Sequence, residues 1–278
     1  MALDTLKRTM FASRMQTALQ KSLIYGNLAN QNYTGDLIPG GTVKVAQIGE
    51  VAVTAYTKAA TLSYEILDDA SLSMVIDQMQ SIAFTIDETD ERFISFDVIG
   101  AALERGMYRV KDTIDQFIAG KYTDAAVTYG AAASPKAVSS GTVFQYLAEF
   151  GEVMDEANLP REGRWIVVPP WVFTKLTIAA STNMNPNGSL WANGWVSGVA
   201  GFDRMYMSNN VAKSGTVYTI LGSAGNEAIS YAGAIDGAIR IFPHETSRGM
   251  KVDGLWVYGG KVVRPDMLAC MYAAETAN

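Results

Sequence analysis

Residues 93–123, FISFDVIGAALERGMYRVKDTIDQFIAGKYT, contain the longest helical pattern of the chain. Large apolar residues recur there in steps of three and four, the spacing of one helix face. Charged residues occupy the other faces, where Lys111 and Asp115 have the spacing of a surface ion pair. At 1.5 Å per residue, a helix of about 27 residues would be roughly 40 Å long. The pattern therefore predicts a spine helix along the length of a domain, with an apolar stripe of Ile99, Leu103, Met107, Val110, Ile114 and Phe117.

Two strand-like segments precede this helix. Residues 42–56 are rich in valine, and residues 72–87 include the alternating Ile82, Phe84 and Ile86. We interpret residues 39–87 as a long projecting arm of two strands that pair with each other. Such a ribbon is marginally stable alone in water, so a neighbouring surface should hold it. Its tip carries Tyr64 and Leu67, large side chains that a solvent-exposed tip would rarely expose.

The N-terminal segment has a different character. Residues 4–24 are predicted to form an amphipathic helix with a loose apolar stripe. Residues 1–35 carry four basic residues, Arg8 and Arg14 among them, against Asp4 alone, which gives a net charge of +3. The whole chain has a net charge of −6, so the remainder carries −9. We expect this basic helix to dock on an acidic surface of its own body or of a neighbour.

The second half of the chain alternates between helices and strands. Residues 143–157 form a clear helical pattern, with Thr142 and Gln145 at capping-box spacing. Residues 164–169 read as a buried strand, and Pro170 begins another helix that reaches about residue 180. Strands are predicted at 216–221, 239–242, 252–264 and 267–273, and a turn at Gly259–Gly260. The fold class is therefore α+β.

Composition narrows the possible functions. Only 18% of residues are charged, against about 25% in typical soluble domains, which indicates apolar surface that association could bury. No uninterrupted apolar run approaches 18 residues, so no membrane span is expected. The only cysteine, Cys270, and the only histidine, His244, are interpreted as a buried strand residue and a turn residue. They exclude a disulfide framework and a cysteine zinc site, and we expect neither metal nor cofactor.

An enzymatic alternative stays open on the acidic residues. A hydrolase with a carboxylate pair would need two such groups held close together in a cleft. The candidates are Asp68–Asp69 and the acidic run of Asp87, Glu88, Asp90 and Glu91. The run matches no calcium-loop spacing and suits a solvated helix entry. The tryptophans are expected in cores and interfaces.

The order of these parts resembles the major capsid proteins of tailed bacteriophages, which have the Hong Kong 97-type shell fold. Several strings resemble the family in the same order. They are GTVKVAQIGEVAVTAYTK, SMVIDQMQSIAFTIDETDER, MYRVKDTIDQFIAGKYTDAA, NLPREGRWIVVPPWVFTKL, GVAGFDRMYMSNN and KVDGLWVYGGKVVRPDMLACM. Together they extend over nearly the whole chain. The resemblance implies an N-terminal arm at 1–38, an extended loop at 39–87, a peripheral lobe with the spine helix at 88–136, an axial lobe at 137–250 and closing strands of the peripheral lobe at 251–278.

The same resemblance implies a function. Pentamers and hexamers of the chain would form an icosahedral shell around double-stranded DNA, with non-specific DNA contact and separate scaffolding, portal and possibly decoration proteins. The particle would assemble in a bacterial cytoplasm and become part of the virion. An encapsulin-type protein compartment is the alternative with the same fold. The candidate inter-subunit contact residues are Arg8, Arg14, Lys58, Tyr64 and Leu67.

Overall fold

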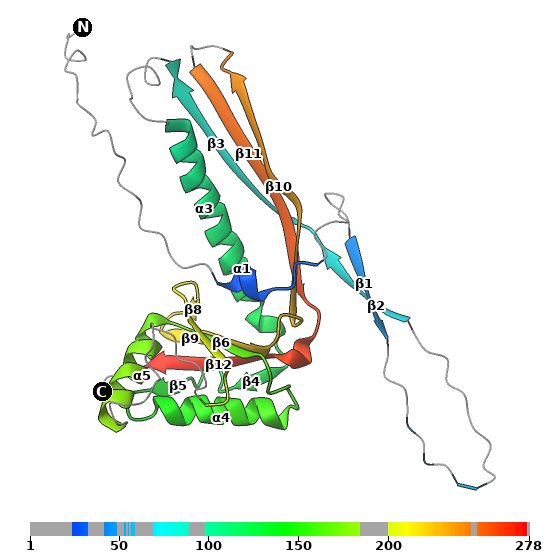
Figure 1. Ribbon diagram of the computed structural model, residues 1–278, viewed down its shortest axis with the longest axis vertical. Coiled ribbons are helices and arrows are strands. Elements are labelled where there is room, and N and C mark those ends of the chain that lie inside the picture. The colour runs from blue at the N-terminus through cyan, green and yellow to red at the C-terminus, as the bar shows by residue number, and fades with distance from the viewer. Residues whose placement is uncertain are drawn as a thin grey trace.

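Among the described residues, two larger sheets organise the fold, one long and narrow and the other broad, and a separate two-stranded hairpin projects from them (Figure 1). The computed structural model describes residues 24–32, 42–48, 53, 55, 57–58, 69–88, 98–183, 200–245 and 249–276. The long sheet has the order β10-β11-β3, and the broad one contains seven strands. The predicted helix at 4–24 lies almost wholly outside the described residues; its last residue, Ile24, precedes α1 (Tyr25–Leu28).

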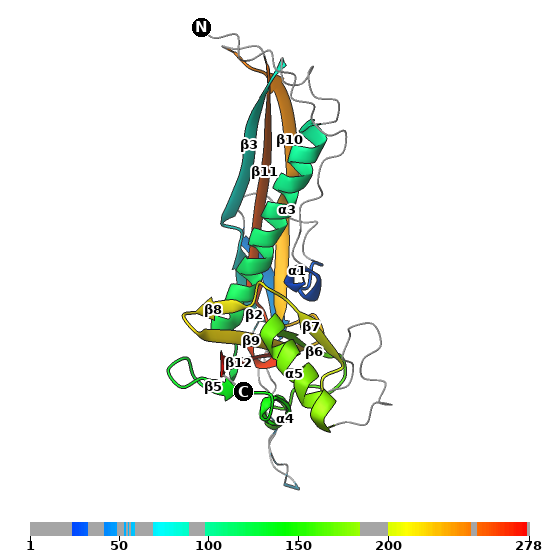
Figure 2. The ribbon, with the colours of Figure 1, turned by 90° about the vertical axis from the view of Figure 1, so that its left-hand side faces the viewer.

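The spine helix is confirmed as α3 (Val98–Ala119), which continues into the 3-10 helix η2 (Gly120–Asp124). It packs along one face of the long sheet, formed by β3 (Gln78–Asp87), β11 (Gly249–Val262) and β10 (Ile229–Pro243) (Figure 2). Along β3 the exposed residues alternate with partly buried ones. The side chain of Ile82 lies against Gly106, where an added Cβ would require the Ile82 side chain to shift.

The prediction that residues 39–87 form two strands paired with each other is wrong for the last part of that segment. β1 (Thr42–Ile48) pairs antiparallel with β2 (Asp69–Val75) and forms a projecting hairpin. β3 instead pairs with β11, from Gln78 opposite Tyr258 to Asp87 opposite Gly249. The physical reason is the apolar alternation of β3: a strand with one apolar face is stable only over a core, which α3 and β11 provide.

The broad sheet runs β4-β12-β9-β6-β7, with β5 beside β12 and β8 beside β9. α4 (Val143–Glu156) and α5 (Pro170–Asn183) pack on it and bury a core that includes Phe150, Met154 and Leu176. The predicted helices and the buried strand at 164–169 are confirmed. The strands are β4 (Val127–Tyr129), β5 (Lys136–Val138), β6 (Arg164–Val168), β7 (Arg204–Met207), β8 (Ala212–Ser214), β9 (Val217–Ala224) and β12 (Leu268–Glu275).

The boundary expected at residues 250/251, between the axial lobe and the closing strands, does not separate the two sheets. β10 was expected in the axial lobe but belongs to the long sheet, and β12 was expected with the closing strands but lies inside the broad sheet. The chain crosses between the sheets at η4 (Pro265–Met267). β12 has fully buried residues at Leu268, Ala269 and Cys270. A strand without a solvent-facing side must lie between others, here β9 and β4.

Two local predictions are also corrected. The Thr142 side chain makes no cap bond to α4; its hydroxyl oxygen accepts from the backbone N–H of Ser139 at 3.0 Å. Gly259 and Gly260 form no turn, because they lie within β11. Glycine is required at 259 by the close approach of another segment to the strand.

Candidate inter-subunit surfaces

The root of the projecting hairpin is fixed to β11. Met74 and Ile76 are buried, and the backbone between them passes over Gly259 so closely that a Cβ there would overlap the carbonyl oxygen of Val75. The Nζ of Lys261 donates to the carbonyl oxygen of Ser73 at 3.0 Å. β1 and β2 therefore extend away from an anchored base (Figure 1).

The predicted contact residues of the arm and hairpin lie mostly outside the described residues, namely Arg8, Arg14, Tyr64 and Leu67. Lys58 is described and exposed, and nearby Val53 is 99% exposed. Among the acidic candidates, Asp87 ends β3 and Glu88 follows it. Asp69 begins β2, whereas Asp68, Asp90 and Glu91 lie outside the described residues. Arg8, Arg14, Lys58, Tyr64 and Leu67 stay predictions as inter-subunit contacts.

The base of the N-terminal segment is held by Asp115 of α3. Its Oδ1 accepts the backbone N–H groups of Ile24 at 3.0 Å and Gly26 at 3.2 Å, and its Oδ2 accepts from Asn210 Nδ2 at 3.0 Å. Asp115 is 1% exposed, so the expected surface pair with Lys111 is replaced by a buried junction. Three segments distant in sequence meet at this carboxyl group.

Burial determines the electrostatics of this junction. Desolvation raises the pKa of Asp115 above its ordinary value, although the hydrogen bonds from Asn210, Gly26 and Ile24 act in the opposite direction. The folded chain therefore binds this proton more tightly than the unfolded chain. The contribution of Asp115 to stability is greatest below the unfolded pKa, about 3.9, and decreases as pH rises through the folded pKa.

Replacing Asp115 with leucine should lower the free energy of unfolding by about 2–4 kcal/mol, because two backbone N–H groups and an amide lose their buried acceptor. Asp115→Asn keeps an acceptor for Ile24 and Gly26, so we expect a smaller loss and a weaker fall of stability with rising pH. Urea unfolding at mildly acidic and neutral pH measures both effects. A leucine variant as stable as the parent chain would disprove this role.

The far end of the long sheet exposes apolar side chains. Ile239, Ile241, Phe242 and Met250 are each between 40% and 54% exposed, and three of them lie on β10, one of the two edge strands of the long sheet as the structure describes it. An apolar edge strand invites pairing with another chain unless something covers it. The sequence indicated a strand at 239–242 but gave no sign that it forms an edge.

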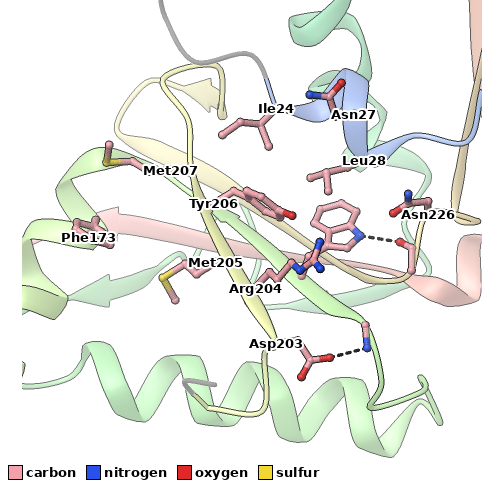
Figure 3. Close-up of a pocket in the computed structure, with 13 residues that line it drawn as sticks. Ile24, Asn27, Leu28, Phe173, Asp203, Arg204, Met205, Tyr206, Met207 and Asn226 are labelled. Carbon is pink, nitrogen blue, oxygen red and sulfur yellow. Dashed lines mark hydrogen bonds between the residues drawn. The ribbon is translucent and has the colours of Figure 1, made fainter. Parts of the chain in front are cut away.

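A groove separates α1 from the edge of the broad sheet. Its volume is about 1070 Å³, and Figure 3 shows Ile24 and Leu28 facing β7 across it. At the floor, Trp165 Nε1 donates to the carbonyl oxygen of Gly225 at 2.6 Å, and the N–H of Gly163 donates to Asp203 Oδ2 at 2.6 Å. The apolar lining consists of Ile24, Leu28, Trp165, Phe173, Met205, Tyr206 and Met207. Sequence reasoning missed this groove, because its two walls come from segments about 180 residues apart.

The side chains with the greatest chemical reactivity, those of His244 and Cys270, belong to structural parts of the fold. His244 follows β10, and its backbone N–H donates to the carbonyl oxygen of Gly249 at 2.9 Å. Cys270 is fully buried on β12, and Trp165 and Trp256 are core residues. Within the described ranges, no three His, Cys, Asp or Glu side chains form a group that could hold a metal. None of the helices that the structure describes is long and apolar enough to cross a membrane.

We expect the Cys270 thiol to resist a disulfide reagent in the folded chain and to react fully in denaturant. The side chain is inaccessible, and burial raises the pKa of the thiol, which reduces the reactive thiolate. Colour development with an aromatic disulfide at mildly alkaline pH measures this. Rapid reaction before denaturation would show that β12 opens readily.

Comparison with known structures identifies the fold as a shell fold. The structure from Mycobacterium phage Che8 has a TM-score of 0.79 at 23% identity, covering 97% of this chain and 98% of that chain. The capsid structure of cyanophage P-SCSP1u has a TM-score of 0.78 at 19% identity, covering 98% and 94%. An encapsulin, the holo-SrpI complex from Synechococcus elongatus PCC 7942, has a TM-score of 0.63 at 12% identity, covering 98% and 95%. No curated protein sequence matches.

The family follows from the sequence itself. A family model described as phage capsid protein matches residues 49–270, well over half of the 278 residues. The chain therefore belongs to the phage capsid protein family. It is a structural component of a virion whose copies associate into a shell, and the Hong Kong 97-type fold expected from the resemblance is confirmed.

Proposed function

We propose that the chain is the major capsid protein that assembles as pentamers and hexamers into an icosahedral shell around double-stranded phage DNA. The observation that carries this proposal is the hairpin β1–β2, which projects from an anchored root instead of packing on its own body. A two-stranded ribbon of this kind gains stability only from a partner surface. The contacts would include Arg8, Arg14, Lys58, Tyr64 and Leu67.

The lobes have corresponding roles in this proposal. The long sheet with α3 would form the peripheral lobe, and the broad sheet would form the axial lobe near the centre of each capsomer. The N-terminal arm would end near residue 23 rather than 38, because Ile24, Tyr25, Leu28 and Ala29 are core residues of the subunit. A deletion of residues 1–30 would therefore damage the fold as well as the arm.

The remaining partners are inferred from charge and chemistry. A body of net charge −9 favours weak, non-specific contact with packaged DNA, which does not hinder packing or release. Scaffolding, portal and possibly decoration proteins would be separate chains, and assembly would occur in the bacterial cytoplasm. We propose no catalytic role, because the buried Asp115 is occupied in joining segments and Cys270 is inaccessible.

An encapsulin-type compartment is the second candidate. The groove between α1 and β7 favours it, because an apolar groove of this size could hold a peptide of a cargo protein. The encapsulin similarity supports the same fold and, at 12% identity, says nothing further about cargo.

Electron microscopy of the purified chain, expressed in a bacterium and collected by sedimentation, tests both candidates. We expect closed shells without a defined protein cargo, and DNA-filled shells when the particle is taken from infected cells. A single protein packed in stoichiometric amounts would favour the compartment. Material that never exceeds small oligomers, even under crowding, would contradict both.

A further inference from the structure

The groove between α1 and β7 runs along the edge of the broad sheet, as far as the strands that the structure describes define it. β7 is the last strand of the broad sheet, and its Met207 is 49% exposed at the groove wall. Seven of the thirteen lining residues are large and apolar or aromatic. An apolar groove beside a sheet edge suits the apolar face of an amphipathic segment.

The chain supplies such a segment. Residues 1–23 join the described structure at Ile24, which itself lines the groove (Figure 3). Their sequence carries the apolar stripe of the predicted helix and a net charge of +3. A lone amphipathic helix cannot bury its stripe by itself, so it needs a partner surface.

We propose that residues 1–23 of one copy dock, stripe inward, in the α1–β7 groove of the next copy. The inference rests on the proposed shell function and specifies one of its contacts. An arm placed in a neighbour's groove is a heterologous contact, and such contacts repeated around an axis close into rings. The same arm in its own groove would add nothing to association.

Charge supports the groove as a binding site for the arm, because two carboxylates at one end outnumber Arg204, the basic residue of the lining. The exposed carboxylates of Glu162 and Asp203 flank Gly163 at one end of the groove. Arg8 and Arg14 lie on an arm whose charge is opposite to that of the body. Lysine and arginine side chains can cover apolar surface while their charged ends reach rim carboxylates.

Disulfide trapping with mixed chains tests the inference directly. Chains with one stripe position changed to cysteine (Leu6, Met10, Met15 or Leu19) are co-expressed with chains that carry Met207→Cys, and the sedimenting material is oxidised mildly. Native Cys270 is fully buried and contributes no competing thiol. The matched control is Met107→Cys on α3, a methionine of similar exposure outside the groove.

We expect a linked species of twice the chain mass from at least one stripe position with Met207→Cys, and none with Met107→Cys. A double-cysteine chain diluted into excess parent chain should give no internal link. An internal link without a dimer would show that the arm fills its own groove and would overturn the inference. No link at any stripe position in normal shells would also overturn it while leaving the shell function intact. Failure of the parent chain to form shells would instead contradict the proposed function.

Discussion

Leu67→Asp is expected to give a folded subunit that does not close into shells. Tyr64, Ile66 and Leu67 lie between β1 and β2 in the sequence, and the root of that hairpin is fixed to β11. Burying Leu67 against a neighbouring subunit would contribute about 1.5–3 kcal/mol of gross transfer free energy, and a buried carboxylate would oppose it strongly. The shell repeats each contact many times, so the loss per subunit is amplified.

Circular dichroism and sedimentation velocity of this variant separate folding from assembly. The helical signal of α3, α4 and α5 should be unchanged, while the shell peak should be replaced by capsomers or single chains. Leu67→Met is the matched control, because it keeps volume and apolarity and should assemble normally. Normal shells from the aspartate variant would show that the tip makes no contact, and loss of helical signal would place the tip in the subunit's own core.

Gly259→Ala is expected to displace the root of the β1–β2 hairpin from β11. The added Cβ would overlap the carbonyl oxygen of Val75 and approach the Cα of Ile76 at 2.9 Å, and both obstacles are backbone atoms that cannot rotate away. Overpacking of this kind costs about 1–3 kcal/mol, and here it also shifts the Lys261–Ser73 contact. We therefore expect lower thermal stability together with a strong loss of closed shells.

The control is Gly120→Ala at the start of η2, where no atom lies within 4 Å of the new Cβ. It should match the parent chain in melting temperature and in shell yield by electron microscopy. If Gly259→Ala behaves like this control, the backbone approach at β11 does not position the hairpin.

Local patterns predicted the elements well, because periodicity reports how a segment is buried. α3, α4, α5 and β6 were predicted in this way. Periodicity does not report what covers the buried face, so the partner of β3 could not be identified: β11 lies more than 160 residues further along the chain. For the same reason the boundary expected at 250/251 separates β10 from β11, with which it shares the long sheet, and β12 from the other strands of the broad sheet.

The candidate surfaces were less predictable than the elements. Asp115 looked like a surface charge on α3, because nothing in its neighbourhood shows that α1 and Asn210 meet there. The groove likewise depends on α1 lying opposite β7. The root of the hairpin did have a local signal in the sequence, namely Gly259–Gly260. Two residues without side chains inside a strand indicate that another backbone segment approaches closely.

The place of β12 in the broad sheet has a consequence for synthesis on the ribosome. β12 is translated after the other strands that the structure describes, yet it lies between β9 on one side and β4 and β5 on the other. Domains whose segments are all present can fold during translation, but this sheet lacks a central strand until residues 268–275 emerge. A chain terminated before residue 268 therefore lacks the strand that joins β9 to β4 and β5, and we expect such a chain not to complete this sheet.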